Sequence, residues 1–321
     1  MLKEISIEII RKCPNNCVHC SSFSHIKRKE IIDLPIIIAM VNDAKILGAT
    51  TICLSGGEPF LHPNIIEIVS HISACGLECY IYTSGIMINK DDFCSLSKDV
   101  LSNIVGKVNK LIFNVEASGE AVYNKIMGTT GCFNLLKESI KKTVDLSIVA
   151  EAHFVPMKLN IHEIKETLFM CEQLGVSKIS FLRLVAHGRA FENETELMLD
   201  ESEMKYLKEL LVEINKSSRL SIRVGVPFSD SREKTRCEAA KGKLNIKYDG
   251  SVFPCEVFKN DRVNLKRKGL FAENIKQKRL LDIYNNSEYL KFVRNYVETY
   301  TCNCDCENCV GQHLITKNAE E

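Results

Sequence analysis

Neither sign of charge is in excess in this sequence. Its 321 residues contain 42 Lys and Arg against 41 Asp and Glu, which gives a formal charge of +1. There is no long block of one sign either, and a short basic group such as Lys266, Arg267 and Lys268 is typical of a solvated loop. The charge pattern therefore gives no reason to expect a nucleic-acid-binding or membrane-binding surface.

Long apolar runs are also missing. The N-terminal stretch MLKEISIEIIRKC is interrupted by charges and is too short for a secretory signal or a transmembrane helix. We therefore expect a cytoplasmic protein, in a compartment whose reducing conditions keep thiols free. With 45% hydrophobic residues, the chain can form one large domain with a substantial core and a smaller appendage.

Cysteine, in contrast, is abundant. Fifteen cysteines in a cytosolic chain point to metal or redox chemistry where they cluster, rather than to disulfides. Six are scattered among apolar neighbours, where a free cysteine behaves as a small hydrophobic residue: Cys53, Cys75, Cys79, Cys94, Cys132 and Cys171. The other nine fall into ordered groups: Cys13, Cys17 and Cys20; Cys237 and Cys255; and Cys302, Cys304, Cys306 and Cys309.

Between residues 5 and 185, β-branched apolar runs alternate with amphipathic helical patterns, as in a parallel sheet covered by helices. The predicted strands are residues 5–10, 50–55, 77–84, 110–117, 147–155 and 178–185. Helices are expected near 34–47, 64–74, 91–103, 132–145 and 161–174, and Gly48, Gly76 and Gly175 suit the position after a helix end. Six sequential units favour an α/β fold, a partial (β/α)6 TIM-like barrel with its chemistry at the C-terminal strand ends, over a doubly wound sheet.

The residue pattern of the sequence changes near residue 230. A helix over 200–216 leads into a segment where KLNIKYDGSVFPCEVF predicts a β-hairpin that turns at Asp249 and Gly250. The last cysteines lie in a stretch too poor in apolar residues to fold without something to organise it. We therefore expect a barrel domain of residues 1–229 and a small cysteine-rich hairpin and loop domain of residues 230–321.

The first cysteine group directly follows the first predicted strand. Its C-x3-C-x2-C spacing, with Pro14 and two asparagines in the turn, suits a loop folded around a metal cluster. Three thiolates hold a four-iron cluster with one iron open to an external ligand, whereas structural zinc takes four ligands. A zinc site that recruits His19 or His25 as fourth ligand is the alternative on spacing alone.

A second motif lies at the end of the second predicted strand, in LSGGEPFLHP, residues 54–63. Its glycines, Gly56 and Gly57, allow a close main-chain approach, and the Glu58 carboxylate suits a cationic group. Such a turn is weak evidence alone, but here it follows the cysteine loop and sits at a strand end. In this order the two motifs resemble those of the radical S-adenosylmethionine (SAM) enzymes, where the turn meets the ammonium group of the SAM methionine.

The resemblance continues after the fourth predicted strand. Residues 114–140 are similar to the corresponding stretch of the peptide-modifying branch, although Asn114, Glu116 and Ala117 replace its Ser-x-Asp-Gly start and Met127 stands where arginine is usual. Ribose hydroxyls need mixed donors and acceptors. The resemblance implies SAM contacts from His19, against the adenine, and from Ser84, Asn114, Glu116, Ser118, Asn160 and Arg183, with ordinary turn, capping or surface roles as the alternative.

The C-terminal cysteines resemble a cysteine-rich extension of the same family, called SPASM in its full form and twitch in its shorter form. Cys237, Gly250 and Cys255 match its start, because a hairpin turn lets a thiolate beyond it approach one before it. The run CNCDCENC adds Cys302, Cys304, Cys306 and Cys309, with closer spacing than the full form normally has. The resemblance implies at least one auxiliary 4Fe–4S cluster, while a second cluster and a zinc ribbon stay open.

This resemblance implies a 4Fe–4S cluster on Cys13, Cys17 and Cys20 that cleaves SAM reductively to a 5′-deoxyadenosyl radical. The leading prediction is an oxidoreductase-type maturase that takes hydrogen from a precursor peptide or protein, giving a cross-link, an oxidation or an epimerisation, with a flavodoxin or ferredoxin as electron donor. Because the first strand begins at residue 5, no N-terminal leader-peptide-binding domain is expected. The alternatives are a small-molecule alcohol or sugar dehydrogenase or isomerase and a non-enzymatic iron–sulfur carrier, against which the Gly-Gly-Glu turn argues.

Overall fold

Six parallel strands form the centre of the fold in this computed structural model, which describes residues 1–90, 92–225, 228, 237–259, 269–300, 309–311 and 314. They confirm the six predicted strands, with ends that differ by up to four residues. The strands are β1 (Glu4–Ile10), β2 (Thr51–Gly56), β3 (Glu78–Thr83), β6 (Lys110–Asn114), β7 (Val149–Phe154) and β8 (Lys178–Phe181).

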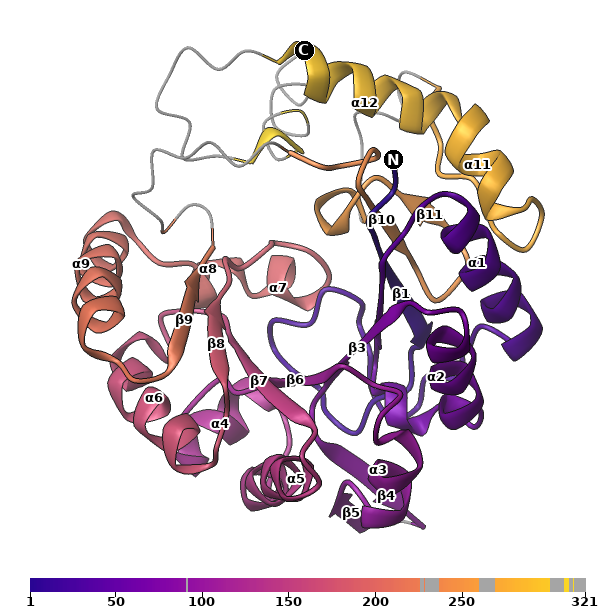
Figure 1. The fold of residues 1–321 in the computed structure, drawn as a ribbon. Coiled ribbons are helices and arrows are strands. Elements are labelled where there is room, and N and C mark those ends of the chain that lie inside the picture. Colours follow the sequence, from indigo (N-terminus) through magenta and orange to yellow (C-terminus); the bar gives the residue numbers. More distant parts are fainter. Residues whose placement is uncertain are drawn as a thin grey trace.

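Three further strands extend this sheet on both sides. Strand β9 (Ser221–Val224) pairs in parallel with β8, and β10 (Lys243–Ile246) pairs in parallel with β1. Strand β11 (Val252–Phe253) pairs with β10 in the antiparallel sense. The order is β11-β10-β1-β2-β3-β6-β7-β8-β9, so β11 and β9 are the edges of a nine-stranded sheet. Figure 1 shows this sheet curved into an arc, which is the predicted partial barrel.

Helices cover the outer side of the arc (Figure 1). They are α1 (Leu34–Ile46), α2 (Ile65–Ala74), α3 (Lys98–Ile104), α4 (Glu120–Met127), α5 (Phe133–Asp145), α6 (Ile164–Gln173) and α9 (Glu201–Ser217). Two short helices, α7 (Arg189–Glu192) and α8 (Glu194–Leu197), follow β8. The helix ends at Gly48, Gly76 and Gly175 are confirmed, because all three glycines have the left-handed backbone conformation that terminates a helix.

The two faces of the sheet differ in polarity. Ile5, Ile7 and Ile9 of β1 are fully buried in the hydrophobic core. Side chains alternate between the faces of a strand, so Glu4 and Glu8 lie on the other, inner face. Polar side chains of other strands share that face, where the Lys110 ammonium of β6 lies 3.1 Å from the Glu151 carboxylate of β7. The inner face is therefore a polar wall that suits polar ligands.

A hairpin after β3 was not predicted from the sequence. Its strands, β4 (Ile86–Asn89) and β5 (Asp92–Ser95), pair antiparallel. The helix predicted over 91–103 is therefore wrong in its first part, since α3 begins only at Lys98. The reason lies at Ser97, whose hydroxyl accepts a hydrogen bond from the Val100 N–H at 3.2 Å and so caps the helix at that point.

The predicted C-terminal hairpin is confirmed as β10 and β11, with the Gly250 N–H donating to the Lys247 carbonyl at 2.8 Å in the turn. Two helices follow, α11 (Leu280–Asn286) and α12 (Glu288–Thr299). Figure 1 shows them at the α1 end of the arc, where Arg279 forms an ion pair with the buried Asp43 of α1. None of the helices in the described part of the chain is both long enough and apolar enough to cross a membrane.

Candidate functional site

The loop that carries Cys13, Cys17 and Cys20 follows β1 and lies on the inner side of the arc (Figure 1). Cys13 is buried, and the other two are partly exposed. Burial raises the pKa of Cys13 and of Cys17 well above the usual thiol range, and the neighbouring thiols raise both further. Metal binding deprotonates cysteine ligands, so a bound cluster would supply the energy that this deprotonation costs.

The three thiols of the cysteine loop lie in the same part of the structure. Across the described residues, no three His, Cys, Asp or Glu side chains lie close enough together to hold a single metal ion. Cys13, Cys17 and Cys20 nevertheless interact electrostatically with one another, so the three thiols of the loop lie near each other.

The Gly-Gly-Glu turn after β2 lies against the start of the cysteine loop. The Gly57 N–H donates to the Ile10 carbonyl at 2.7 Å, and the Glu58 N–H donates to the Lys12 carbonyl at 2.9 Å. A Cβ atom on Gly56 would lie 2.1 Å from the Ile10 oxygen, and one on Gly57 would lie 2.1 Å from the Lys12 oxygen. The close main-chain approach that the sequence suggested for a ligand is therefore made by the chain's own backbone. This contact requires glycine at both positions.

Glu58 is fully buried, and its carboxylate is held by the chain itself. Oε1 accepts from the Phe60 N–H at 3.2 Å and from the Thr83 hydroxyl at 2.8 Å. Oε2 accepts from the Ser84 N–H at 2.8 Å and from the Ser84 hydroxyl at 2.6 Å. Burial raises the pKa of Glu58, although these hydrogen bonds oppose the rise. Glu58 therefore fixes Ser84 beside the turn, and its contact with a ligand ammonium stays a prediction.

The partly buried His19 pairs with the fully buried Glu116 at the cysteine loop, with His19 Nε2 3.5 Å from Glu116 Oε1. Burial, and then the charge of Arg189, lowers the pKa of His19 to about 4, and burial raises the pKa of Glu116 to about 8. The imidazole is therefore neutral at pH 7. Its buried Nδ1 has no hydrogen-bond partner within the part of the chain that the structure describes. A neutral ring with an unused nitrogen suits contact with a flat heterocycle such as adenine.

The other predicted contact residues lie near the same C-terminal edge of the sheet. Asn114 ends β6, and Arg183 lies two residues after β8. The Ser118 hydroxyl and N–H both donate to Glu163 Oε2, at 3.0 and 2.8 Å. The Asn160 amide donates to the Glu116 carbonyl at 2.9 Å and so shapes the backbone next to that carboxyl. The structure thus brings these residues to one edge, and their contacts with a cofactor stay predictions.

Arg189, the first residue of α7, holds the cysteine loop from across the arc, and sequence reasoning missed it. Its Nε donates to the Cys17 carbonyl and its Nη2 to the Ser24 carbonyl, both at 2.7 Å. Its N–H donates to the Cys20 carbonyl at 2.9 Å. Nothing in the local sequence marks this arginine, because its three acceptors are backbone carbonyls far away in the chain.

The end of α4 holds the same loop from a second direction. The Asn16 N–H donates to the Met127 carbonyl at 3.0 Å, and the Val18 N–H donates to the Ile126 carbonyl at 2.9 Å. Met127 is fully buried, and its sulfur lies 3.8 Å from the Cys17 sulfur. The residue that departs from the family pattern at this position is therefore in contact with a predicted cluster ligand.

Replacing Arg189 by methionine should loosen the cysteine loop. Hydrogen bonds from a charged donor contribute about 1.5–3 kcal/mol each, so the loss of both side-chain bonds should lower the free energy of unfolding by about 3 kcal/mol. Lysine at position 189 keeps the charge but lacks the planar guanidinium group, so it should recover only part of the lost free energy of unfolding. Urea unfolding measures the effect, with Lys165→Met, which removes an exposed ion pair to Glu213, as the control. An unfolding free energy of Arg189→Met equal to that of the control would contradict the role.

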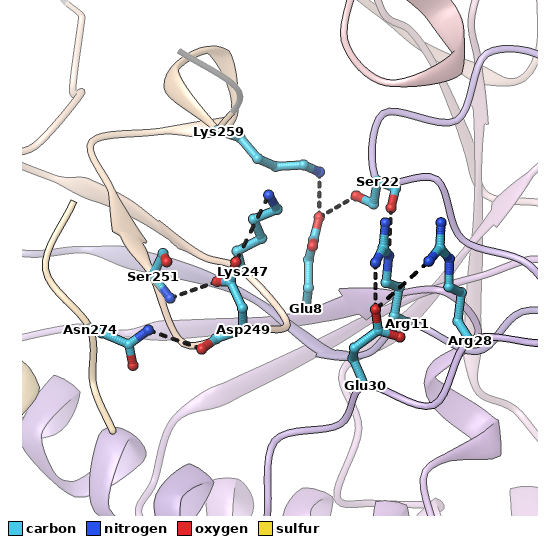
Figure 2. Close-up of polar contacts among 10 residues, drawn as sticks. All are labelled: Glu8, Arg11, Ser22, Arg28, Glu30, Lys247, Asp249, Ser251, Lys259 and Asn274. Atoms are coloured by element: carbon cyan, nitrogen blue, oxygen red, sulfur yellow. Dashed lines mark hydrogen bonds and ion pairs between the residues drawn. The ribbon is translucent and has the colours of Figure 1, made fainter. Parts of the chain in front are cut away.

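A buried polar network joins β1, the cysteine loop and the C-terminal region (Figure 2). Glu8 of β1 accepts a hydrogen bond from the Ser22 hydroxyl at 2.7 Å and forms an ion pair with Lys259. Arg11 donates to the Ser22 carbonyl at 2.9 Å, and its guanidinium lies 4.4 Å from the centre of the Tyr248 ring. Side chains from both ends of the chain therefore fix the residues that directly follow Cys20.

Three of the C-terminal cysteines come together. Cys237, Cys255 and Cys309 lie within electrostatic range of one another. Burial, together with the two neighbouring thiols, raises the pKa of Cys255 to about 12. The hairpin brings the segments that carry Cys237 and Cys255 together, because the Ala240 N–H donates to the Pro254 carbonyl at 2.8 Å. The remaining predicted ligands lie outside the described residues: Cys302, Cys304 and Cys306.

Comparison with protein families gives a match in each half of the chain. Residues 7–171, just over half of the chain, match the profile described as the Radical SAM superfamily. Residues 237–310 match the profile named SPASM, described as an iron-sulfur cluster-binding domain. The first match contains the loop of Cys13, Cys17 and Cys20, and the second contains all six C-terminal cysteines.

Curated relatives are distant in sequence. The PqqA peptide cyclase of Bradyrhizobium diazoefficiens is 22% identical over 256 residues, which cover 78% of this chain and 66% of the cyclase. The chain thus spans just under two thirds of that relative's length. The AdoMet-dependent heme synthase of Methanosarcina barkeri is 20% identical over 316 residues, which cover 91% of this chain and 84% of the synthase.

Among solved structures, SuiB of Streptococcus suis bound to S-adenosylmethionine superposes with a TM-score of 0.74 at 15% identity, over 96% of this chain and 71% of SuiB. SuiB bound to its precursor peptide SuiA gives the same TM-score, over 95% of this chain and 68% of SuiB. At this level of identity the likeness shows that the fold is shared.

Proposed function

Because the chain belongs to the radical SAM superfamily and carries a C-terminal SPASM iron–sulfur domain, we propose that it is an oxidoreductase-type enzyme that modifies a precursor peptide or protein. The product is a cross-link, an oxidation or an epimerisation. The observation that carries the proposal is the loop of three thiols at the inner edge of the sheet, joined through Lys259 to a second group of thiols. The names of the PqqA peptide cyclases, and of SuiB with its precursor peptide, support the peptide as substrate class.

In this proposal Cys13, Cys17 and Cys20 hold a 4Fe–4S cluster, and SAM binds at the adjoining strand ends. When bound, the cluster and SAM supply a 5′-deoxyadenosyl radical that takes a hydrogen atom from the substrate. The residues proposed to contact SAM are His19, Gly56, Gly57, Glu58, Ser84, Asn114, Glu116, Ser118, Asn160 and Arg183.

The chain's own residues orient these groups and shape the substrate side. Tyr82 of β3 and His153 of β7 pack together on the inner face, with ring centres 5.2 Å apart. Burial lowers the pKa of His153 to about 3, and burial raises that of Tyr82, so both side chains are neutral at pH 7. Neutral donors and acceptors on a polar wall suit an uncharged polar group such as a peptide amide.

We also propose that the chain is divided into a barrel domain of residues 1–229 and an auxiliary domain of residues 230–321. Cys237, Cys255 and Cys309, which lie together, would hold at least one auxiliary 4Fe–4S cluster with a ligand from Cys302, Cys304 or Cys306. Such a cluster could ligate a substrate atom or accept an electron from a product radical.

Replacing Cys255 by alanine distinguishes the role of the C-terminal cysteines from that of the first cysteine loop. SAM cleavage should stay measurable, because the first loop is intact, while formation of modified product should fall by about tenfold or more. Chromatography of 5′-deoxyadenosine and mass spectrometry of the peptide measure the two quantities in one reaction. Cys75→Ala, at the end of α2 and far in sequence from both groups, is the control. An unchanged yield of product in Cys255→Ala would remove any role for an auxiliary cluster.

Two aspects of the cellular setting belong to the same proposal. A flavodoxin or ferredoxin would supply the electron, and the protein would act in the cytoplasm, where fifteen cysteines remain reduced. No nucleic-acid or membrane partner is proposed, because the formal charge is only +1.

A direct test uses the short peptide encoded by a neighbouring open reading frame as substrate. The reconstituted enzyme is incubated with this peptide, SAM and dithionite in deuterated water. Loss of hydrogen mass indicates a cross-link or oxidation, and gain of deuterium at one residue indicates epimerisation. If the peptide stays unmodified and the enzyme instead turns over an alcohol or sugar made by the enzymes of a neighbouring metabolic gene cluster, the substrate is a small molecule.

A further inference from the structure

The ion pair between Glu8 and Lys259 is almost completely buried. Glu8 is 2% exposed and Lys259 is 5% exposed. The Lys259 ammonium contacts the Glu8 carboxylate and also donates to the Ser21 hydroxyl at 3.0 Å, while the Ser22 hydroxyl donates to Glu8 at 2.7 Å. Figure 2 shows Lys259 and Ser22 converging on the same Glu8 oxygen from different segments. Both serines directly follow Cys20, so the pair holds the end of the cysteine loop.

Lys259 also belongs to the rigid segment that begins at Cys255. The short 3₁₀ helix Glu256–Phe258 separates the two residues, and the Phe258 N–H donates to the Cys255 carbonyl at 3.1 Å. A second link fixes this turn, because His187 Nε2 lies 2.8 Å from the Val257 carbonyl oxygen. A single turn of chain therefore connects a predicted auxiliary ligand to a cation that contacts the first cysteine loop.

The charge of Lys259 is maintained despite its burial. Desolvation alone would lower its pKa, but the Glu8 and Glu256 carboxylates outweigh it and raise the pKa above the usual lysine range. The ammonium also interacts electrostatically with Cys20. A buried unit charge acts through a lower dielectric than water provides, so its effect on a neighbouring redox centre is large.

We propose that Lys259 is a positioning residue through which the C-terminal domain fixes the Cys20 end of the cysteine loop and raises the reduction potential of the cluster held there. This inference rests on the proposed cluster at Cys13, Cys17 and Cys20. A positive charge stabilises the more negative, reduced cluster, and Glu8 acts in the opposite sense while it neutralises the pair. Lys259 and Glu8 thus act on the potential in opposite senses, and the exposed Glu256 carboxylate, 3.7 Å from the ammonium, adds to the effect of Glu8.

Opposite charges give opposite shifts, which a purely structural role does not. Lys259→Met should lower the midpoint potential of the cluster, because it removes the cation and leaves the Glu8 carboxylate. Glu8→Gln should raise it, because it removes the carboxylate nearest the ammonium and leaves Glu256, 3.7 Å away, as its partner. The double variant should return close to the wild-type potential, and Lys259→Arg should stay close to it, since the charge is kept.

The experiment is a redox titration of the full-length, reconstituted protein, monitored by the electron paramagnetic resonance signal that changes when SAM is added. This readout isolates the SAM-binding cluster from auxiliary clusters. The control is Lys278→Met, which removes an exposed ion pair to Glu273 in the same region of the chain and should leave the potential unchanged. Thermal unfolding shows which variants are folded. If Lys259→Met is not folded, Glu8→Gln and the double variant still test the predicted direction of the shift in midpoint potential.

The outcomes are separable. A fall for Lys259→Met and a rise for Glu8→Gln support the proposal. Shifts of the same sign in both, or no shift in either, overturn it and leave the pair as a structural contact only. A wild-type protein with no SAM-responsive signal contradicts the cluster assignment itself, and this result is seen before any variant is compared.

Discussion

Replacing Cys17 by alanine should abolish formation of 5′-deoxyadenosine. Cys17 is the central residue of the cysteine loop, its sulfur contacts that of Met127, and its carbonyl accepts from Arg189. The substitution leaves two thiols, and a four-iron cluster that also needs one open iron cannot be held by two protein ligands. Nucleoside formation should therefore fall to the level of protein without iron, as measured by chromatography after reduction with dithionite.

Cys94→Ala is the matched control for this prediction. Cys94 is a partly exposed cysteine in the β4–β5 hairpin, and it is one of the six that the sequence assigns to ordinary packing. It should keep both the iron content and the rate of the wild type. Turnover of Cys17→Ala at the wild-type rate would refute the proposed cluster site.

Gly57→Ala should damage both stability and SAM cleavage, through sterics alone. The new Cβ would lie 2.1 Å from the Lys12 carbonyl oxygen and 2.7 Å from that of Arg11, and both are backbone atoms that cannot turn aside. The Gly-Gly-Glu turn must then move away from the cysteine loop, which breaks the hydrogen bonds to Ile10 and Lys12. We expect a loss of about 3 kcal/mol in the free energy of unfolding and a fall of about tenfold or more in nucleoside formation.

Gly119→Ala supplies the comparison, because its Cβ would meet no atom closer than 3.5 Å, an oxygen of the Glu163 side chain. Gly119 is the N-cap of α4, where alanine is less favourable than glycine, so its unfolding free energy should fall by about 1 kcal/mol, well short of the loss in Gly57→Ala. Urea unfolding and the nucleoside assay measure both variants. If Gly57→Ala is as stable and as active as Gly119→Ala, the turn does not need its close contact with the loop.

The fold was predictable where the pattern is local. Alternating apolar strands and amphipathic helices located all six central strands, and glycines located helix ends. Strand β10 pairs with β1 from Glu4↔Lys243 to Ile7↔Ile246, and no sequence pattern links segments so far apart. The β4–β5 hairpin was missed because its strands, IMIN and DFCS, are only four residues long and show no alternation of apolar and polar residues.

For the candidate site, the same division applies. The cysteine loop and the Gly-Gly-Glu turn were found because each motif is contiguous in sequence. Arg189 and Lys259 were missed because each acts on that loop through partners that only the folded chain brings close. Glu58 was expected to face a ligand, yet its burial and its bonds to Thr83 and Ser84 depend on how β3 lies beside β2.

The most direct test of the account is formation of 5′-deoxyadenosine by protein that is purified anaerobically, reconstituted with iron and sulfide, and given SAM and dithionite. The nucleoside should form, and its formation should depend on Cys13, Cys17 and Cys20. If protein with a demonstrably loaded cluster yields no nucleoside, radical initiation is contradicted, and an iron–sulfur protein with a structural or electron-carrying role becomes the better description.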